Sequence, residues 1–392
     1  MHNSVFFAAT RLHRIYFQKL CSNKPELTVC WYRTVKNCWP LVRFNPRLIA
    51  IVQQAQTKTL NTRGRPLPMG LSRLYHWALL LKSAWLYNSY WCYLTANKPD
   101  VCVVWNGLKY RQQLWCLCCE QLGIKLRYME NGLLTGFTTL DAKGVNFGNS
   151  LPREADFYRD YAVNKGINKG ADEPPNRLDT ENENEASIVK SLPKRFVFVP
   201  FQVNGDSQII CYSPWIQNMA HLASVLIESL PTFRAAGLEV VVKPHPKCST
   251  PNAKVLALLK THGVTVVTDT DSKRLVAQSQ AVLTINSTVG LEALAAGKKV
   301  IVLGQAFYRI KDISLGAGNS RELQTAIGQL ANWAPDIQAV SGLMHYLKQE
   351  YQIEGDWRTA NAGHIQCLLT RLEQFNGATI NGATINGATT WQ

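Results

Sequence analysis

The sequence lacks any hydrophobic stretch long enough to cross a bilayer. A membrane-spanning helix needs about 20 consecutive apolar residues, and the longest candidate, residues 77–94, is interrupted by Lys82, Ser83, Asn88 and Ser89. The N-terminus also lacks the basic-then-apolar order and the small-residue cleavage site of a secretory signal peptide. We therefore expect a cytoplasmic protein.

Paired metal-ligand spacing is absent as well. The eleven cysteines are scattered, and their densest group, residues 115–119, has neither CxxC nor Cys/His spacing. This argues against a zinc site and favours buried free thiols in a reducing compartment. A glycine-rich loop is also missing between the first two expected strands, residues 4–9 and 27–32, so the usual phosphate cradle is not expected there.

Acidic residues are scarce in the first part of the chain. Residues 1–150 contain 19 Lys and Arg against 5 Asp and Glu, so they carry +14 of the total charge of +15, and they hold seven of the eleven Trp. Such a region suits nucleic acid, an anionic membrane surface or an anionic acceptor. Because no nucleic-acid-binding motif is present, we expect a membrane surface or an anionic acceptor and no nucleic acid. In the alternative interpretation, the tryptophans belong to the core and the charge only maintains solubility.

The order of expected elements predicts two α/β domains. A chain of 392 residues with 46% hydrophobic residues is long enough for two cores, and short β-branched runs alternate with helical segments in both halves, as in parallel βαβ units. We predict a Rossmann-like domain in residues 1–161, a mobile linker in 162–190 and a second Rossmann-like domain in 191–375. Residues 376–392 repeat Asn-Gly-Ala-Thr and form a low-complexity tail.

Two motifs in the second half follow expected strands. Residues 240–242 lead into Lys243-Pro244-His245-Pro246, and residues 281–285 lead into Asn286-Ser287-Thr288, which begins a helix that contains Glu292. Ligands of parallel sheets bind at the carboxyl ends of the strands, so both motifs should face one crevice.

The residue types in these motifs favour a nucleotide. Hydroxyls and free N–H groups at a helix start bind phosphate, Lys243 and His245 add charge and a hydrogen bond, and Glu292 would accept hydrogen bonds from ribose or base. Taken singly, Ser287 is a helix cap and Glu292 a solvated side chain. Taken together, these residues predict a nucleotide site.

Two carboxylates follow strands in different halves. Glu130 comes directly after the expected strand 125–129, and Asp206 lies in a Gly-Asp-Ser-Gln turn after the strand 196–200. If they face each other across a sugar, one would act as nucleophile and the other as general acid/base, the division used in retaining glycosyl chemistry.

Taken in order, these motifs resemble the bacterial capsule polysaccharide biosynthesis and export proteins, and in particular the KpsS/LipB-like β-Kdo transferases that build a lipid-linked Kdo primer. The resemblance covers about residues 100–310. It rests on Glu130-Asn131-Gly132, Asp141, Gly144-Val145-Asn146, residues 149–153, Val199-Pro200, Gln202, Asp206-Ser207-Gln208, residues 243–246, residues 286–294 and residues 304–308.

The resemblance implies a GT-B-like glycosyltransferase, in which a cleft separates an acceptor domain (1–161) from a nucleotide-sugar domain (191–375). It would transfer Kdo from CMP-Kdo with retention to an anionic phospholipid such as lyso-phosphatidylglycerol. The reaction would take place at the inner-membrane surface of a Gram-negative bacterium, beside capsule biosynthesis or export proteins. Because Lys, His and a helix terminus can neutralise one leaving phosphate, we expect neither metal nor other cofactor.

The resemblance also implies roles for single residues. Asp206 would be the nucleophile or the carboxylate that stabilises the oxocarbenium-like centre, Glu130 the general acid/base, and His245, a third catalytic residue, would bind the CMP phosphate or the Kdo carboxylate. The donor would also contact Lys243, Gln202, Gln208, Asn286, Ser287, Thr288 and Glu292. Further cleft residues would be Asn131, Asn146 and Arg153.

Other functions stay open from the residues alone. The phosphate-site residues do not identify the base or the sugar, so another GT-B glycosyltransferase or a sugar-nucleotide epimerase is an alternative. The N-terminal hundred residues match weakly, which leaves a non-catalytic scaffold of a capsule export complex as the third interpretation.

Overall fold

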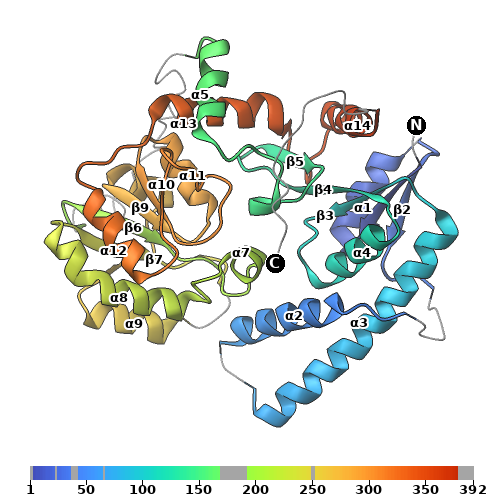
Figure 1. Cartoon of the computed structure of the whole chain (residues 1–392), viewed down its shortest axis with the longest axis horizontal. Helices are drawn as coiled ribbons and strands as arrows, with labels where there is room; N and C mark the ends of the chain where they lie inside the picture. Colours follow the sequence, from blue (N-terminus) through green and yellow to red (C-terminus); the bar gives the residue numbers. More distant parts are fainter. Residues whose placement is uncertain are drawn as a thin grey trace.

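The chain forms two lobes, each built around a six-stranded sheet (Figure 1). The computed structural model describes residues 3–22, 24–36, 43–64, 67–167, 192–248 and 252–377. Most of the expected linker, residues 168–190, and the expected tail from residue 378 onward lie outside the described residues.

The first sheet has the strand order β12-β5-β4-β3-β1-β2. Strands β1 to β4 are parallel, whereas β5 is antiparallel to β4 and β12 is antiparallel to β5. The strands are β1 (Ser4–Ala8), β2 (Leu27–Trp31), β3 (Val101–Trp105), β4 (Lys125–Asn131), β5 (Phe137–Asp141) and β12 (Ile353–Glu354). Every residue of β1 and β3 is buried, because both faces of a parallel sheet are covered.

In the described part of the N-terminal half, four helices belong to the first lobe. Helices α1 (Arg11–Cys21) and α4 (Tyr110–Gln121) are the expected crossover helices. Helices α2 (Arg47–Arg63) and α3 (Met69–Asn97) form an antiparallel pair that projects from the lobe (Figure 1). Helix α2 has little apolar periodicity in the sequence, because it is rich in Gln and Thr and buries only Leu48, Ile51 and Val52.

The second sheet is entirely parallel, with the order β11-β10-β9-β6-β7-β8. Its strands are β6 (Phe196–Pro200), β7 (Glu239–Lys243), β8 (Thr265–Val266), β9 (Ala281–Thr284), β10 (Lys299–Val302) and β11 (Leu315–Gly316). The helices of this lobe are α7 (Ser207–Tyr212), α8 (Met219–Ala235), α9 (Ala253–Thr261), α10 (Ser272–Gln278), α11 (Thr288–Ala295), α12 (Ser320–Gln329) and α13 (Ile337–Tyr346). The expected architecture, two Rossmann-like domains in a GT-B-like arrangement, is confirmed.

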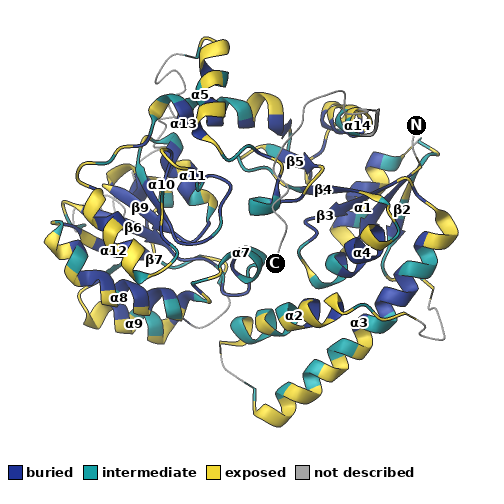
Figure 2. Ribbon diagram, in the orientation of Figure 1, coloured by how far each residue is buried: buried dark blue, intermediate teal, exposed yellow. Residues whose placement is uncertain are grey.

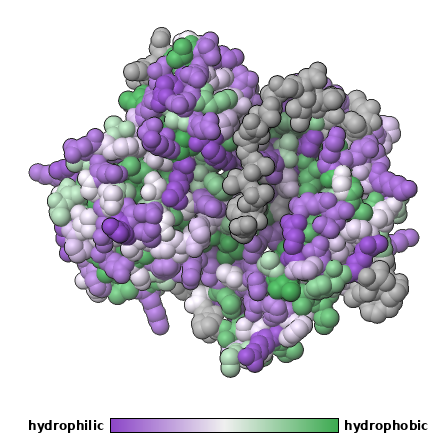
Figure 3. Space-filling view, in the orientation of Figure 1, coloured by the Kyte–Doolittle hydropathy of each residue, from purple (hydrophilic) through white to green (hydrophobic). Residues whose placement is uncertain are grey.

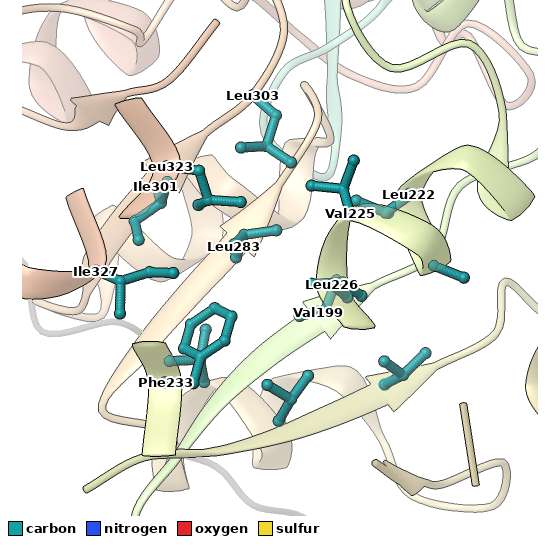
Figure 4. Close-up of a cluster of buried hydrophobic side chains, with 14 of the residues drawn as sticks. Val199, Leu222, Val225, Leu226, Phe233, Leu283, Ile301, Leu303, Leu323 and Ile327 are labelled. Carbon is teal, nitrogen blue, oxygen red and sulfur yellow. The ribbon is translucent and has the colours of Figure 1, made fainter. Parts of the chain in front are cut away.

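Separate hydrophobic clusters cover the two faces of the second sheet. On one face, Val225 and Leu226 of α8 and Ile327 of α12 pack over Leu283 of β9 (Figure 4). On the other face, Leu291 of α11 belongs to a second cluster, to which α10 and α13 also contribute. Each such buried side chain stabilises the fold by about 1.5–3 kcal/mol. The strands whose ends build the site are therefore held in place by packing on both faces of the sheet.

Each lobe also takes a helix from the other part of the chain. Helix α5 (Ala155–Asn164) crosses α13, and its Tyr158 belongs to the core of the second lobe. Helix α14 (Ala362–Gly377) returns to the first sheet, where the His364 ring Nε2 lies 2.9 Å from the Tyr16 hydroxyl oxygen. Helix α5 therefore packs on the second lobe and α14 on the first, a pairing that local sequence does not reveal, because the apolar face of a helix does not specify which sheet it will cover.

The cysteine expectation holds in part. Nine cysteines are free thiols, and burial raises the pKa of Cys116, Cys118 and Cys119 above its usual range, which makes these thiols poor nucleophiles. Cys92, in contrast, is disulfide-bonded, so the expectation of free thiols is wrong there. None of the helices in the described ranges has both the length and the apolar character to pass through a bilayer.

The crossing of α5 and α13 depends on Gly342. A Cβ atom at this position would lie 2.0 Å from the carbonyl oxygen of Tyr158, which is backbone and has no room to move away. We predict that Gly342→Ala lowers the free energy of unfolding by about 1–3 kcal/mol. The matched control is Gly328→Ala in α12, where nothing lies within 4 Å of the added Cβ, and which should stabilise the protein by about 0.5–1 kcal/mol. Urea unfolding of both variants tests the contact, and equal effects would contradict it.

Candidate functional site

The candidate site lies where the carboxyl ends of the parallel strands of the two sheets face each other (Figure 1). Helix α7, which follows β6, contacts α2 of the first lobe, and the rings of Phe147 and Tyr212 approach to 5.8 Å. We call this region the interlobe site. It is defined by Asn106, Glu130 and Asn131 on the first lobe and by Asp206, Lys243, His245, Ser287 and Thr288 on the second.

Two buried amides join neighbouring strand ends of the second sheet. Gln202 Nε2 donates to Asn286 Oδ1 at 3.0 Å, and the Asn286 backbone N–H donates to Gln202 Oε1 at 3.2 Å. Asn286 Nδ2 donates further to the carbonyl oxygens of Gln208 and Tyr212. These hydrogen bonds show that Gln202 and Asn286 hold the two strand ends together, and their contact with a sugar donor stays a prediction.

Asp206 begins the short helix α7. Its Oδ1 accepts a hydrogen bond from the Gln208 backbone N–H at 2.9 Å, the usual N-cap arrangement. The half-buried side chain is thereby held in one orientation. Gly205, just before it, leaves room for α2, because a Cβ there would lie 2.2 Å from Thr62 Oγ1.

Lys243 and His245 follow β7, which is the neighbour of β6 in the sheet. Lys243 Nζ lies 3.4 Å from Ser272 Oγ. The backbone N–H of Lys247 donates to His245 Nδ1 at 3.0 Å, so the proton of the neutral ring is on Nε2. Burial, together with Lys247 and Lys243, lowers the pKa of His245, while Asp206 opposes the shift. His245 is therefore a neutral hydrogen-bond donor near neutral pH.

Ser287 and Thr288 stand at the start of α11. Ser287 Oγ accepts from the Val289 N–H, and the Ser287 carbonyl accepts from the Tyr308 hydroxyl at 2.5 Å. Gly290 is required here, because a Cβ would lie 2.4 Å from that hydroxyl oxygen. The Thr288 side chain is exposed beside this helix start.

Glu292 lies one turn further along α11. Its side chain is exposed, yet partial exclusion of water raises its carboxyl pKa, with Lys273 opposing and Asp271 adding to the shift. Asp271 is the second carboxylate of the sequence Asp269-Thr270-Asp271. Its side chain accepts a hydrogen bond from the Lys273 backbone N–H and so caps helix α10. Within the described ranges, no three His, Cys, Asp or Glu side chains are grouped as metal ligands would be.

On the first lobe, Glu130 is held by three N–H donors. Asn106 Nδ2 donates to Oε2, and the backbone and side-chain N–H groups of Asn131 donate to Oε1 at 2.9 and 2.8 Å. Asn131 Oδ1 in turn accepts from Trp357 Nε1 at 2.8 Å. All three partners of Glu130 are donors, so this carboxyl group acts as an acceptor in the structure.

The loop that carries Asn146 and Arg153 is organised by the fully buried Asp141. Its carboxylate accepts from the backbone N–H groups of residues 143, 144 and 150 and from the hydroxyls of Ser150 and Tyr351. Arg153 donates to carbonyl oxygens of the same loop. Burial lowers the Arg153 pKa, and its donors serve the loop, so we assign Arg153 to loop geometry.

Sequence reasoning misses two lysines of the interlobe site. Lys58 on α2 is within electrostatic range of Asp206 of the other lobe and of Lys109 at the start of α4. Burial and Lys109 lower the pKa of Lys58, whereas Asp206 raises it. The sequence offers only a weak signal for either residue, because both are single lysines in a basic region.

The structure therefore brings the predicted residues together in two groups. One contains Asp206, Lys243, His245, Ser287 and their amide support; the other contains Glu130 and Asn131. In the described part of the chain, no hydrogen bond or ion pair joins Glu130 to Asp206.

Residues 176–357 match the family described as "Capsule polysaccharide biosynthesis protein". Protein FixF of Sinorhizobium fredii is 30% identical over 294 residues, which are 73% of this chain and 69% of that protein. The capsule polysaccharide export protein KpsS of Escherichia coli is 28% identical over 177 residues, 42% of this chain and 43% of that protein.

Two solved structures share the general arrangement at low identity. The beta Kdo 2,4 transferase of Thermosulfurimonas dismutans KpsC is 15% identical, with a TM-score of 0.46, and 95% of this chain and 98% of that chain are covered. The UDP-GlcNAc 2-epimerase of Methanocaldococcus jannaschii is 12% identical, with a TM-score of 0.36 and coverage of 88% and 99%. At these TM-scores neither structure is a basis for assigning chemistry to the chain.

His13, beside Lys109 on the first lobe, gives a pH prediction. It is buried, stacks on Trp105 at 5.1 Å, and its Nδ1 has no hydrogen-bond partner. Burial, and then Lys109, lowers its pKa from 6.5 to about 4. The folded state disfavours protonation of His13, whereas the unfolded state does not. The stability that the neutral, buried ring contributes is therefore complete above pH 6.5 and is lost as the pH falls towards 4. The loss should be about 3 kcal/mol.

The measurement is urea unfolding of the wild type and of His13→Phe at several pH values from 7.5 to about 4. Phenylalanine keeps an aromatic ring against Trp105 and removes the titrating group. The variant should lose stability less steeply with falling pH, and identical slopes would contradict the assignment.

Proposed function

The chain belongs to the capsule polysaccharide biosynthesis family, and on that premise we propose that it is a glycosyltransferase. It transfers Kdo from CMP-Kdo, with retention of configuration, to a phospholipid primer of the lyso-phosphatidylglycerol type at the inner-membrane surface. The observation that carries the proposal is the interlobe site, where each lobe contributes a carboxylate fixed by N–H donors and one of them lies beside a Lys-His pair.

The second lobe is the donor side in this proposal. CMP leaves as a monophosphate, which carries less charge than a diphosphate, so Lys243, His245 and the start of α11 suffice to stabilise it. A neutral His245 donates its Nε2 proton to a phosphate oxygen, and Lys243 supplies the positive charge. Ser287 and Thr288 hold the nucleotide, and Glu292 accepts from its hydroxyls.

Asp206 is the nucleophile in the first half of the reaction. One carboxylate oxygen bonds to the anomeric carbon of Kdo while the bond from that carbon to the CMP phosphate oxygen breaks, so the electron pair leaves with CMP. The N-cap bond to Gln208 fixes the direction of attack and costs no reorganisation at the moment of reaction.

Glu130 completes the reaction from the opposite lobe. It takes the proton of the acceptor hydroxyl, whose oxygen then bonds to the anomeric carbon and releases Asp206; two displacements retain the configuration. A carboxyl group surrounded by N–H donors suits a base better than an acid, and a phosphate leaving group needs little protonation.

A second candidate function is a non-catalytic role in a capsule export complex. It is favoured by the similarity to KpsS of Escherichia coli, a capsule polysaccharide export protein. The two candidates differ in whether Asp206 is needed for chemistry, which the following experiment decides.

The proposal predicts CMP release and a product heavier by one Kdo when the protein is given CMP-Kdo and a lyso-phosphatidylglycerol analogue. Asp206→Asn should keep the helix cap but lower kcat by about 10³-fold or more, with CMP affinity changed less than about threefold. Asp336→Asn, which likewise keeps a helix cap at α13, is the matched control and should retain activity.

Three outcomes would contradict this proposal. Preferential use of UDP or GDP sugars would indicate another donor, and an α-linked product would exclude retention. Full transfer activity of the Asp206→Asn variant would show that Asp206 is not the nucleophile. A folded protein that releases no CMP would favour the export role.

Lys58 and Lys109 supply the charge that an anionic acceptor needs. We predict that Lys58→Gln raises the KM for the phospholipid acceptor about tenfold and leaves donor hydrolysis without acceptor unchanged, because Lys58 comes from the first lobe. Lys254→Gln, an exposed lysine on α9, is the control and should change neither value. A loss of donor hydrolysis in Lys58→Gln would place this lysine on the donor side instead.

A further inference from the structure

The first half of α3 leaves five large apolar side chains in solvent. Met69, Leu71, Leu74, Trp77 and Leu81 are 72%, 55%, 67%, 62% and 67% exposed. Figure 2 shows this end of the α2–α3 pair as largely exposed, and Figure 3 shows hydrophobic residues among hydrophilic ones on the same projection. An exposed apolar surface of this kind usually marks a binding surface.

The exposed residues form one stripe along the helix. At about 100° per residue, Leu71, Leu74, Trp77 and Leu81 fall within an arc of roughly 120°. From Leu71 to Leu81 the stripe runs over eleven residues, a rise of about 15 Å along the helix. We call these four residues the α3 stripe.

The opposite face of α3 is already occupied by the protein. Ser72 accepts hydrogen bonds from Gln56 of α2, Tyr75 bonds to Thr59, and His76 bonds to Gln56. These bonds fix the rotation of α3, so the stripe faces away from α2 and outward from the lobe.

The charge around the stripe selects the kind of partner. Residues 27–99 contain no Asp or Glu, whereas they contain ten Lys and Arg. On the helix, Arg73 and Lys82 fall just beyond the two edges of the stripe. An apolar stripe with basic residues on both sides matches an anionic lipid surface, where the apolar side chains enter the acyl boundary and the cations meet headgroups.

We propose that the α3 stripe docks this protein on an anionic bilayer, with α3 lying in the plane of the interface. The surface is separate from the interlobe site, and the proposal does not depend on the identity of the sugar donor. The proposal agrees with a phospholipid acceptor. Three side chains of α3 bond to α2, and α2 carries Lys58 to the interlobe site.

Vesicle flotation tests the proposal with the full chain and no substrate. The wild type should float with vesicles of phosphatidylcholine containing roughly 30% phosphatidylglycerol and much less with pure phosphatidylcholine. The triple variant Leu74→Gln, Trp77→Gln and Leu81→Gln should bind at least tenfold more weakly. Arg73→Gln and Lys82→Gln should each weaken binding about fivefold at low salt and have little effect at high salt.

The matched control is the double variant Leu12→Gln and Ile15→Gln. Both side chains are exposed and apolar, 65% and 55%, but lie on α1, so this variant should float like the wild type. Equal binding by the triple variant and the wild type would overturn the proposal, as would binding that is indifferent to anionic lipid. A wild-type dimer that the triple variant converts to a monomer, measured by light scattering, would show that a second copy covers the stripe instead.

This experiment is independent of the proposed reaction. Transfer to a short-chain, water-soluble acceptor should be the same in the triple variant and the wild type, because no stripe residue belongs to the interlobe site. If flotation succeeds and no transfer occurs with any acceptor, the docking surface stands and the proposed function fails.

Discussion

Two hydrogen bonds between buried amides determine how the donor side of the site is built. Gln202 and Asn286 follow adjacent parallel strands, and each completes the hydrogen bonding of the other. An unpaired buried amide costs about 1–3 kcal/mol, so neither side chain is free to turn towards a ligand. Their pairing holds the turn that carries Asp206 beside the helix start at Ser287. The geometry of the site therefore depends on a pairing between two residues that are far apart in the sequence.

The relative position of the lobes depends on chain segments that cross between them. Helix α14 returns to the first sheet after the second is complete, and α5 leaves the first to pack on the second. A third connection is the contact of α2 with α7, which Gly205 permits. Because these connections lie on both sides of the interlobe site, the distance between Glu130 and Asp206 is set by tertiary packing. A substrate held between the lobes would meet two carboxylates whose own orientations are already fixed by N–H donors.

The sequence predicts the local parts of this structure well and the long-range parts poorly. The β-branched runs identify β6, β7 and β9, and the Ser287 cap is visible in its motif, because both signals are local. Helix α2 is missed because a polar helix with few buried residues has no clear periodicity. The pairing of Gln202 with Asn286 is not predicted, because it spans 84 residues of sequence. Lys58 and Lys109 belong to no motif, and only the fold brings Lys58 near Asp206 and near Lys109.

The α2–α3 pair shows how one polar interface can serve two surfaces. Gln56 and Thr59 of α2 bind the inner face of α3, which leaves the α3 stripe outside and holds α2 against the second lobe. If the stripe lies on a bilayer, side-chain hydrogen bonds between α3 and α2 link the membrane-bound helix to the helix that carries Lys58. A lipid acceptor has to keep its acyl chain in the membrane while its headgroup reaches the donor sugar. Under the docking proposal, a helix that lies on the membrane and is bonded to a second helix carrying Lys58 couples the membrane surface to the first-lobe side of the interlobe site.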